Sequence, residues 1–334
     1  MRIGLAYDLK EAIPVEGGGP DDALEEYDSA ATVELIAAAL RVRGHSVIML
    51  GGGSVFLDNI RREKVDIVFN IAEGRGSYRS REAQVPAILE MLDIPYVGSD
   101  PQCLAICLDK AVTKKLVVAD GIVTPEWRVI TDGEELARIS WNDFPFPAII
   151  KPAYEGSSKG IRLDSIAHTA EQVTAMARKL LSLYCQPVMV EEFIAGDEIT
   201  VGIVGNSPPE VVGLMRVLSR RNEAFFVYSV EVKRDWKVLV DYECPARVGE
   251  AVWDRISAAS LKVFKTLGCR DFARLDFRVS REGIPYFLEV NPLPGLGTHS
   301  DLVIMAQKMG RAHQELICAV LDSALGRYPQ CVRV

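Results

Sequence analysis

Apolar residues in the first hundred positions follow two different periods. Runs of strand length occur at IGLAY, HSVIML and VDIVFNI, whereas residues 29–43 and the stretch VPAILEMLDI repeat apolar residues at helical spacing. Glycines stand near the ends of the helical stretches. Strands that alternate with helices in this way predict an α/β domain built on a parallel sheet.

The pattern changes after about residue 98. SDPQCLAICLDKAVTKKLVVADG predicts two short helices, and PAIIKPAYEGSSKGIRL predicts a strand, a glycine and serine loop, and a second strand. VMVEEFIAGDEITVGIVG opens a third unit, which ends in helices from about residue 301 to 325. We therefore expect three domains, over residues 1–98, 99–187 and 188–334, with α+β character in the C-terminal part.

The stretch RLDFRVSREGIPYFLEVN, residues 274–291, places two acidic residues inside otherwise apolar runs. A two-residue turn at Glu282-Gly283 would make the runs a hairpin. Asp276 then faces Glu289, Arg274 faces Asn291, and the period of two puts all four side chains on one face.

Like charges directly across a strand pair are unfavourable, so we expect a positive group between the two carboxylates. Oxygen ligands of this kind suit Mg²⁺, which binds through one or two carboxylates together with substrate phosphates. The alternative is a hairpin with a solvated polar face.

Composition narrows the class of protein. The 334 residues are 49% hydrophobic and 25% charged, which suits a globular chain of two or three domains. A net charge of -8 argues against a nucleic-acid partner, although a local phosphate site remains compatible with it. The start MRIGLAYDL fits neither a signal peptide nor a membrane span, so we expect a cytoplasmic protein with no membrane partner.

Seven cysteines, at scattered positions, match no disulfide framework and no zinc pair. Cys103 and Cys107 are four residues apart on a predicted helix. Buried packing is the interpretation that the sequence favours for this pair over metal ligation.

The loop AYEGSSKG, residues 153–160, follows Lys151 at a strand end. Its glycines allow backbone amides to approach a phosphate, and serine hydroxyls and lysine add further donors. The loop lacks GxxxxGK, and GxGxxG is also absent from it. A flexible surface hairpin loop is the alternative.

The motifs LDK near residue 110, IIKPAYEGSSKG, VMVEEFIAGDEITV, ARLDFRV and FLEVNPLPGLGTHS occur in this order. Together they resemble the ATP-grasp superfamily, and within it the D-alanine–D-alanine ligase family, from about Val65 onward. The resemblance implies a three-domain ATP-grasp fold with an N-terminal parallel-sheet pre-ATP-grasp domain. It also implies that ATP lies between two sheets, with Mg²⁺ that Mn²⁺ can replace.

Matched positions receive roles from this resemblance. The implied nucleotide-binding residues are Lys110 and Lys151 at the phosphates, Ser157 and Ser158 in the closing loop, Glu191, Glu192, Phe193 and Ile194 at the adenine, and Glu198 at the ribose. The implied metal ligands are Asp276, Glu289 and Asn291. The implied catalytic residues are Arg274, Gly295, Ser157 and Lys233.

The chemistry that the resemblance implies has two steps. A substrate carboxylate attacks the γ-phosphate of ATP to form an acylphosphate, and the amine of a second substrate then attacks it. Arg274 and the Gly295 amide would stabilise the oxyanion. Closure of the serine loop and of residues 219–242 would exclude water.

The substrate half departs from the family pattern. AEGRGSYRSREAQ replaces HGxxGEDG, so that Glu73 stands at the usual histidine, and Lys233 is followed by arginine rather than tyrosine. Aspartate replaces leucine after HS, and YDLKEAIPVEGGGPDDALEEYDS replaces GGxSxE, with Glu25 a loose match to the usual glutamate. The implied substrate residues are Glu25, Glu73, Arg234, Ser300 and Asp301.

Three hypotheses follow. The first is an ATP-dependent carboxylate-amine ligase with an altered substrate pocket, acting on small molecules, namely an amino acid or amine and a carboxylate. The second is a D-alanine–D-alanine ligase of cell-wall synthesis, and the third a silent nucleotide-binding homologue. Retained charged residues at the site favour an enzyme. The resemblance leaves a homodimer open.

Overall fold

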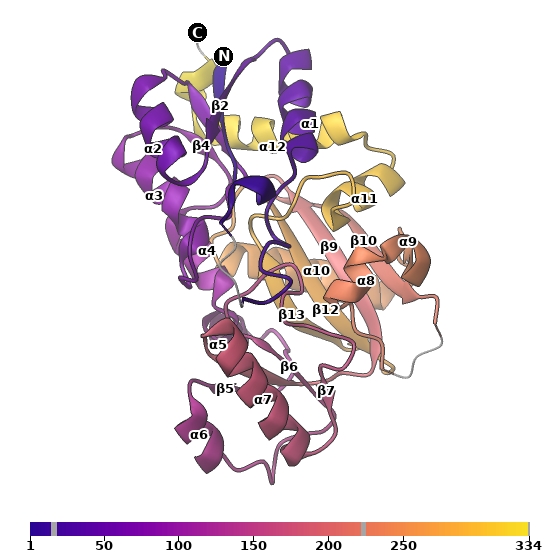
Figure 1. Ribbon diagram of the computed structural model, residues 1–334. Helices are drawn as coiled ribbons and strands as arrows, with labels where there is room; N and C mark the ends of the chain where they lie inside the picture. Colours follow the sequence, from indigo (N-terminus) through magenta and orange to yellow (C-terminus); the bar gives the residue numbers. More distant parts are fainter. Residues whose placement is uncertain (15–18, 222–224, 333–334) are drawn as a thin grey trace.

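Three β-sheets carry the fold in the computed structural model, which describes residues 1–14, 19–221 and 225–332 (Figure 1). Two sequence expectations extend beyond this range. The long N-terminal segment 8–28 and the segment 219–242 each include a few residues outside the described part of the chain. Among the described residues, no helix is long and apolar enough to cross a membrane.

The first sheet is parallel, as the sequence predicts, with strand order β2-β1-β3-β4. Its strands are β1 Arg2–Ala6, β2 Ser46–Gly51, β3 Ile67–Asn70 and β4 Tyr96–Val97. Its helices are α1 Ala30–Val42, α2 Gly53–Arg62 and α3 Gln84–Met91. The Ser29 hydroxyl caps α1 by accepting a hydrogen bond from the Thr32 amide at 3.2 Å, which explains where the helix begins.

The second sheet follows two short helices, α4 Pro101–Leu108 and α5 Lys110–Ala119, which the sequence predicts correctly. Its elements are β5 Trp127–Ile130, α6 Gly133–Arg138, β6 Ala148–Pro152, β7 Ile166–Ala167, α7 Ala170–Tyr184 and β8 Val188–Glu192, in the strand order β5-β8-β6-β7. β8 begins at residue 188, where we expected the third domain to start, yet it lies in the middle of this sheet. A boundary after Glu192 keeps the sheet whole.

The strand expected directly after the glycine and serine loop is wrong. Residues 160–163 lie outside any strand, and the next strand is the two-residue β7. The Gly160 amide instead donates to the Asp22 carboxylate at 2.8 Å. This segment is therefore fixed by the N-terminal part of the chain, a long-range contact that local sequence cannot reveal.

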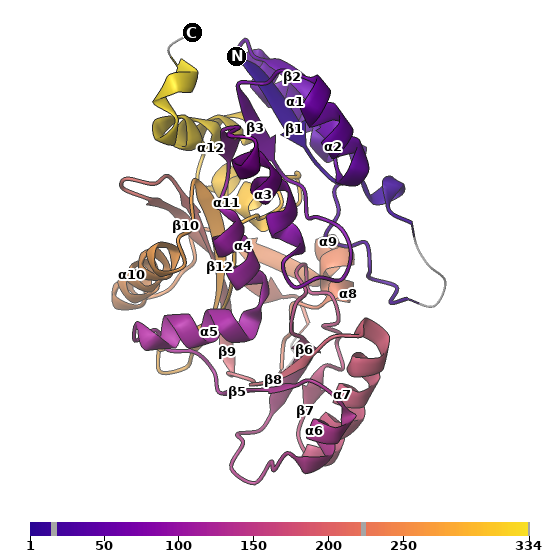
Figure 2. The ribbon, with the colours of Figure 1, turned by 90° about the vertical axis from the view of Figure 1, so that its left-hand side faces the viewer.

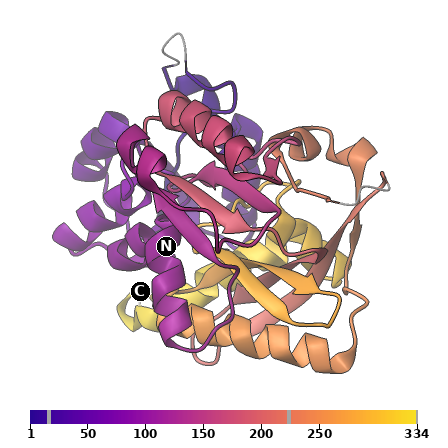
Figure 3. The same cartoon turned by 90° about the horizontal axis from the view of Figure 1, so that it is seen from below.

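The third sheet is antiparallel, with the order β11-β10-β9-β12-β13. Its strands are β9 Gly196–Val204, β10 Glu210–Ser219, β11 Val240–Glu243, β12 Phe272–Ser280 and β13 Pro285–Asn291. The helices of this part are α8 Val230–Arg234, α9 Trp236–Leu239, α10 Glu250–Thr266, α11 Asp301–Lys308 and α12 His313–Arg327. Seen from below, α7 lies outside the second sheet and α10 outside the third, so the two sheets lie between these helices (Figure 3).

The two ends of the chain share one core. Ile36 and Leu40 of α1 belong to the same buried cluster as Leu316 and Val320 of α12. Figures 1 and 2 accordingly show α12 beside the first sheet. The C-terminal helix thus completes the core of the N-terminal sheet.

The β12-β13 hairpin has the expected pairs at its far end but a different turn. The loop contains three residues, Arg281 to Gly283, because the Ser280 amide bonds to the Ile284 carbonyl at 3.0 Å and Gly283 adopts a φ of +73°. A β-bulge then shifts the register between Asp276 and Phe277. The bulge compensates for the longer loop.

Candidate active site

The paired faces of β12 and β13 carry the polar residues that the hairpin argument singled out. Asp276 lies opposite Glu289, and Arg274 lies opposite Asn291. This confirms the expected pairing at the end of the hairpin where the polar side chains lie.

Two cations lie beside the two carboxylates, as charge balance requires. Arg274 Nη2 is 3.0 Å from Asp276 Oδ2, and Lys110 Nζ is 3.3 Å from Glu289 Oε2. The Thr200 hydroxyl donates to the other Asp276 oxygen at 3.0 Å. Lys110 therefore reaches this face from the start of α5, although it precedes the hairpin by more than a hundred residues in the sequence.

The electrostatic setting differs between the carboxylates. Burial raises the pKa of Glu289, but Lys110 and Lys151 outweigh it and hold this pKa well below its ordinary value. Burial raises the pKa of Asp276, and Arg274 offsets that only in part. The Asn291 amide nitrogen has no hydrogen-bond partner among the described residues. Two carboxylates and an amide form an oxygen-rich donor set that fits a divalent cation such as Mg²⁺.

A buried carboxylate holds two lysines behind this face. Glu191 Oε2 is 2.7 Å from Lys151 Nζ, and Glu191 Oε1 is 2.6 Å from Lys114 Nζ. Burial lowers the pKa of Lys114 to about 8, and Glu191 acts against this shift. The sequence reasoning missed Lys114, which lies four residues after Lys110 and so on the same side of α5. That spacing was the available signal.

One pocket brings together most of the residues assigned to nucleotide and metal binding. Twelve residues that received a role from the resemblance line this pocket: Lys151, Ser158, Glu191, Glu192, Phe193, Ile194, Glu198, Lys233, Arg274, Asp276, Glu289 and Asp301. The sequence reasoning had not assigned six others, namely Ile149, Ile161, Val227, Tyr228, Arg278 and Leu288. Lys110 contacts the pocket through Glu289.

Two of the missed residues lie on the hairpin. Arg278 lies on the Arg274 and Asp276 face at the strand period of two, and its guanidinium carbon is 4.4 Å from the centre of the Phe193 ring. Arg278 also lies 3.6 Å from the Glu198 carboxylate. Strict alternation would turn Leu288 away from Glu289, but the bulge lets both line the pocket. The bulge gave no sequence signal.

The serine loop is tied to the segment that follows β10. Ser157 and Ser158 both have positive φ, +50° and +61°. The Ser158 hydroxyl donates to the Tyr228 carbonyl at 2.8 Å, and Lys110 donates to the Glu155 carbonyl of the same loop. These bonds hold the loop beside the pocket.

A second pocket adjoins the first. It is lined by Glu25, Ser157, Tyr228, Val230, Lys233, Arg234, Trp236, Tyr242, Arg274, Gly295, His299, Ser300 and Asp301. Four residues line both pockets: Tyr228, Lys233, Arg274 and Asp301. The junction therefore carries two cations and one anion.

Gly295 and Ser300 lie close together in the second pocket. A Cβ at Gly295 would lie 2.8 Å from the Ser300 hydroxyl, so a larger residue would displace Ser300. Burial lowers the pKa of Lys233, and the neighbouring Arg274 lowers it further. A glycine and a lysine thus line this pocket together with Arg274.

Arg234 and Asp301 do not pair with each other. Asp301 is buried, lies 3.5 Å from Arg274 and accepts a hydrogen bond from the Tyr228 hydroxyl at 3.2 Å. Arg234 lies on the outer side, where its guanidinium binds Glu25 at 2.8 Å and Asp21 at 3.0 Å. Asp301 is thus a buried anion on the pocket wall beside Arg274, whereas Arg234 is paired with the N-terminal segment.

Glu73 lines neither pocket. Burial raises its pKa well above the ordinary value, and the nearby Glu82 and Glu26 raise it further. Glu26 itself binds Arg81 at 2.8 Å and Lys159 at 3.1 Å. Glu25 therefore faces the second pocket, whereas its neighbour Glu26 joins a buried cluster of charges.

The second and third sheets carry Lys151 and Arg274 on strands that line the first pocket, and the glycine and serine loop of residues 153–160 lies beside it. This arrangement is typical of an ATP-grasp enzyme. A family model described as "D-ala D-ala ligase C-terminus" matches residues 116–322. The chain belongs to the D-alanine–D-alanine ligase family and is an ATP-dependent ligase that forms amide bonds.

Individual relatives agree with this assignment. The chain is 34% identical over 302 residues to an uncharacterized protein, y4sG, of Sinorhizobium fredii, covering 88% of this chain and 87% of that one. It is also 34% identical over 298 residues to a D-alanine–D-alanine ligase of Aquifex aeolicus, covering 88% and 94%.

Solved structures share the fold. A Bacillus anthracis D-alanine–D-alanine ligase complexed with ATP superposes with a TM-score of 0.75 at 23% identity, covering 99% of both chains. The VanG D-Ala:D-Ser ligase of Enterococcus faecalis gives a TM-score of 0.72 at 21% identity, covering 97% of this chain and 99% of that one. These similarities confirm the predicted ATP-grasp fold.

Proposed function

We propose that this chain binds ATP and Mg²⁺ in the first pocket and joins a carboxylate substrate to an amine substrate held in the second. The observation that carries the proposal is the position of Arg274. It lines both pockets and lies within 3.0 Å of Asp276 and 3.5 Å of Asp301. A guanidinium at this junction can stabilise charge on a transferred phosphoryl group and on a tetrahedral oxyanion.

Individual residues then take the following roles. Asp276, Glu289 and Asn291 hold the metal, and Lys110 and Lys151 face the phosphates beneath the serine loop. Bound ATP with its magnesium supplies the activated phosphoryl group. Lys233 and the Gly295 amide lie beside Arg274 at the second pocket, where they complete the set of donors to the oxyanion.

The second substrate, we propose, carries a polar or cationic group in addition to its attacking amine. Asp301 is a buried anion on the wall of the second pocket. It accepts a hydrogen bond from the Tyr228 hydroxyl, which bonds to the Tyr242 hydroxyl at 2.6 Å, and Trp236 and His299 line the same pocket. A buried anion in this pocket favours a cationic or hydrogen-bonding group over a methyl group.

The test is an ADP-release screen over pairs of amino acids and amines, with mass spectrometry of the product. D-alanine alone should release little ADP, and a second substrate with an added polar or cationic group should release more. Asp301→Leu should shift the preference toward small neutral amino acids, whereas Arg234→Tyr alone should shift it less, since Arg234 is already paired. Efficient formation of D-alanyl-D-alanine by the unmodified protein would overturn the altered-substrate proposal.

A D-alanine–D-alanine ligase is the second candidate. The similarity to the D-alanine–D-alanine ligase of Aquifex aeolicus favours this candidate, because the match covers 94% of that protein. The same screen separates the two candidates. Cytoplasmic location, homodimer formation and the use of Mn²⁺ in place of Mg²⁺ stay predictions.

A further inference from the structure

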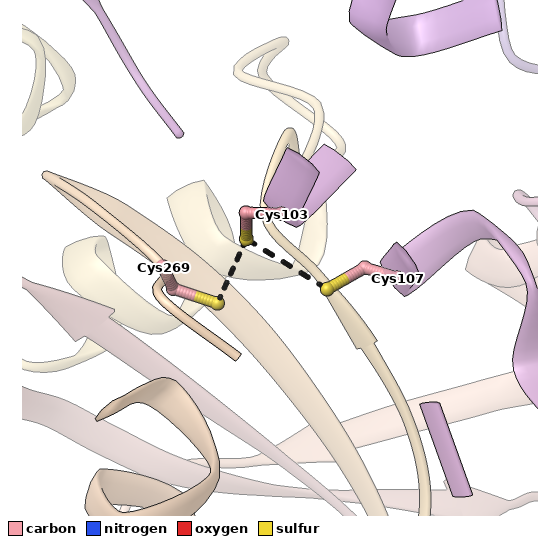
Figure 4. Close-up of side chains that lie close together, drawn as sticks. All are labelled: Cys103, Cys107 and Cys269. Atoms are coloured by element: carbon pink, nitrogen blue, oxygen red, sulfur yellow. Dashed lines mark hydrogen bonds between the residues drawn. The ribbon is translucent and has the colours of Figure 1, made fainter. Parts of the chain in front are cut away.

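Three buried thiols meet on the side of β12 away from the proposed active site. Cys103 and Cys107 lie one turn apart on α4, and Cys269 lies in the segment that leads into β12 (Figure 4). Cys103 Sγ is 3.8 Å from Cys107 Sγ and 3.6 Å from Cys269 Sγ, and all three sulfurs lie within 4.8 Å of one another. The side chains are 1%, 4% and 7% exposed.

The separations fit a shared metal ion. Zinc–thiolate bonds of about 2.3 Å place the sulfurs of a tetrahedral site about 3.8 Å apart. A disulfide would need a separation of about 2.05 Å and would leave one thiol over. Here three sulfurs converge on one point, two from α4 and one from the segment before β12.

The surroundings favour thiolate at this point. The Cys103 amide donates to the Asp100 side chain at 2.8 Å, so the sulfur lies in the first turn of α4, near the positive end of the helix dipole. Hydrogen bonds with Cys107 and then Cys269 lower the pKa of the Cys103 thiol, against the effect of burial.

We propose that Cys103, Cys107 and Cys269 bind one soft d¹⁰ metal ion, zinc or copper(I). No histidine or carboxylate joins the three thiols among the described residues, so the ligand set is sulfur alone, which selects these ions over magnesium. Binding releases the thiol protons to solvent and needs no oxidant or reductant.

Occupation of this site would connect two parts of the fold. Cys107 precedes Lys110 by three residues, and Cys269 precedes Arg274 by five. A metal ion would therefore fix the start of α5 relative to β12, and with it the lysine and the arginine that meet at the proposed active site. The site is separate from the proposed magnesium ligands.

The test uses reduced, metal-stripped, full-length protein equilibrated with Zn²⁺ or Cu(I) in separate arms. Elemental analysis after gel filtration should find one ion per chain in at least one arm. Alkylation followed by mass spectrometry, carried out in urea so that burial alone does not shield the thiols, should show Cys103, Cys107 and Cys269 protected with the ion and alkylated without it, whereas the exposed Cys185 reacts in every arm. The melting temperature should rise with the ion bound.

Variants provide the comparison. Cys103→Ala and Cys107→Ala should each lose the stoichiometric ion, and Cys185→Ala should keep it. Substoichiometric binding in both arms, binding that survives Cys103→Ala, or a disulfide within the trio in protein purified without reductant would each overturn the proposal. If Cys103→Ala does not fold, the alkylation pattern of the unmodified chain decides. None of these measurements depends on ligase activity. The metal proposal can therefore fail while the proposed function holds, and the reverse.

Discussion

At the scale of single residues, Glu289 carries the clearest functional prediction. Glu289→Gln removes one negative charge from the proposed metal face while keeping the shape of the side chain. Turnover should fall by several orders of magnitude because a clamp on a transferring phosphoryl group is lost. ADP release measured across a magnesium titration checks this.

The control for this variant is Glu282→Gln, which changes an exposed carboxylate at the tip of the same hairpin. It should leave turnover unchanged, and circular dichroism should find both variants folded. Near wild-type turnover of Glu289→Gln would contradict the assignment of Glu289 as a magnesium ligand.

Asp28 carries a prediction about pH and stability. Burial raises its pKa to about 7, and the Asp8 carboxylate adds to the shift. Between about pH 4 and 7 the folded state therefore holds a proton that the unfolded state does not, so this contribution to stability is lost as the pH rises through 7. Asp28→Asn lacks this titration.

The variant should match the wild type near pH 4 and exceed it at pH 8, by at most about 4 kcal/mol in the free energy of unfolding. Urea denaturation at a series of pH values measures the difference. Glu82, whose pKa burial also raises to about 7, titrates in both proteins and cancels in the comparison. Asp58→Asn, on the exposed side of α2, is the control. A difference that does not change with pH would contradict the prediction.

At the scale of elements, the N-terminal segment before α1 is joined to the substrate side of the protein by ion pairs. Asp21 and Glu25 bind Arg234 of α8, and Asp22 accepts from Arg162 at 2.9 Å. Because Arg234 is partly exposed, Arg234→Gln should change the free energy of unfolding by less than about 1 kcal/mol. Local opening of residues 19–28 and α8 should nevertheless become more frequent.

Hydrogen exchange measures this opening directly. Exchange should speed up in residues 19–28 and in α8, and in the wild type it should respond to salt, which screens exposed pairs. Arg220→Gln is the matched control, because Arg220, which directly follows β10, forms a similarly exposed pair with Asp241 of β11. Equal exchange in the two variants would rule out a specific role for Arg234.

The elements also show how far sequence reasoning extends. The pairing of Asp276 with Glu289 was predictable, because a strand period of two and the placement of charge are local properties. The three-residue loop and the bulge were not, since Gly283 marks a turn without fixing its length. Lys114 and Arg278 were also predictable, because Lys114 stands at helical spacing from Lys110 and Arg278 at strand spacing from Arg274. Asp22, which fixes the end of the serine loop, lies too far away in the sequence for any local pattern to reveal it.

At the scale of the whole molecule, Asp271 connects three parts of the chain. This fully buried carboxylate accepts from the Gly98 amide at 2.7 Å, from the Asn206 side chain at 2.7 Å and from Arg327 Nε at 2.9 Å. The partners follow β4, follow β9 and lie in α12. Asp271→Asn, which tolerates the positive φ of this position, should lower the free energy of unfolding by about 3 kcal/mol.

Urea denaturation should show one transition at lower denaturant, since the three parts lose the same anchor. Asp322→Asn breaks the exposed pair with Arg43 and should cost less than about 1 kcal/mol. If Asp271→Asn lowers the free energy of unfolding by no more than Asp322→Asn does, Asp271 does not anchor the three parts of the chain.

The bulge in β13 has a consequence for changes in chain length. The loop from Arg281 to Gly283 is one residue longer than a tight hairpin needs, and Leu288 absorbs the extra residue before Glu289 is reached. Between the loop and the bulge, β13 is also fixed by contacts outside the hairpin, because the Phe287 amide donates to the Val123 carbonyl at 2.8 Å and the Phe287 carbonyl accepts from the Thr124 hydroxyl at 2.8 Å. An epitope inserted at Glu282 should therefore be tolerated without misplacing the proposed metal-binding face, which makes this tip a suitable point for attaching a label.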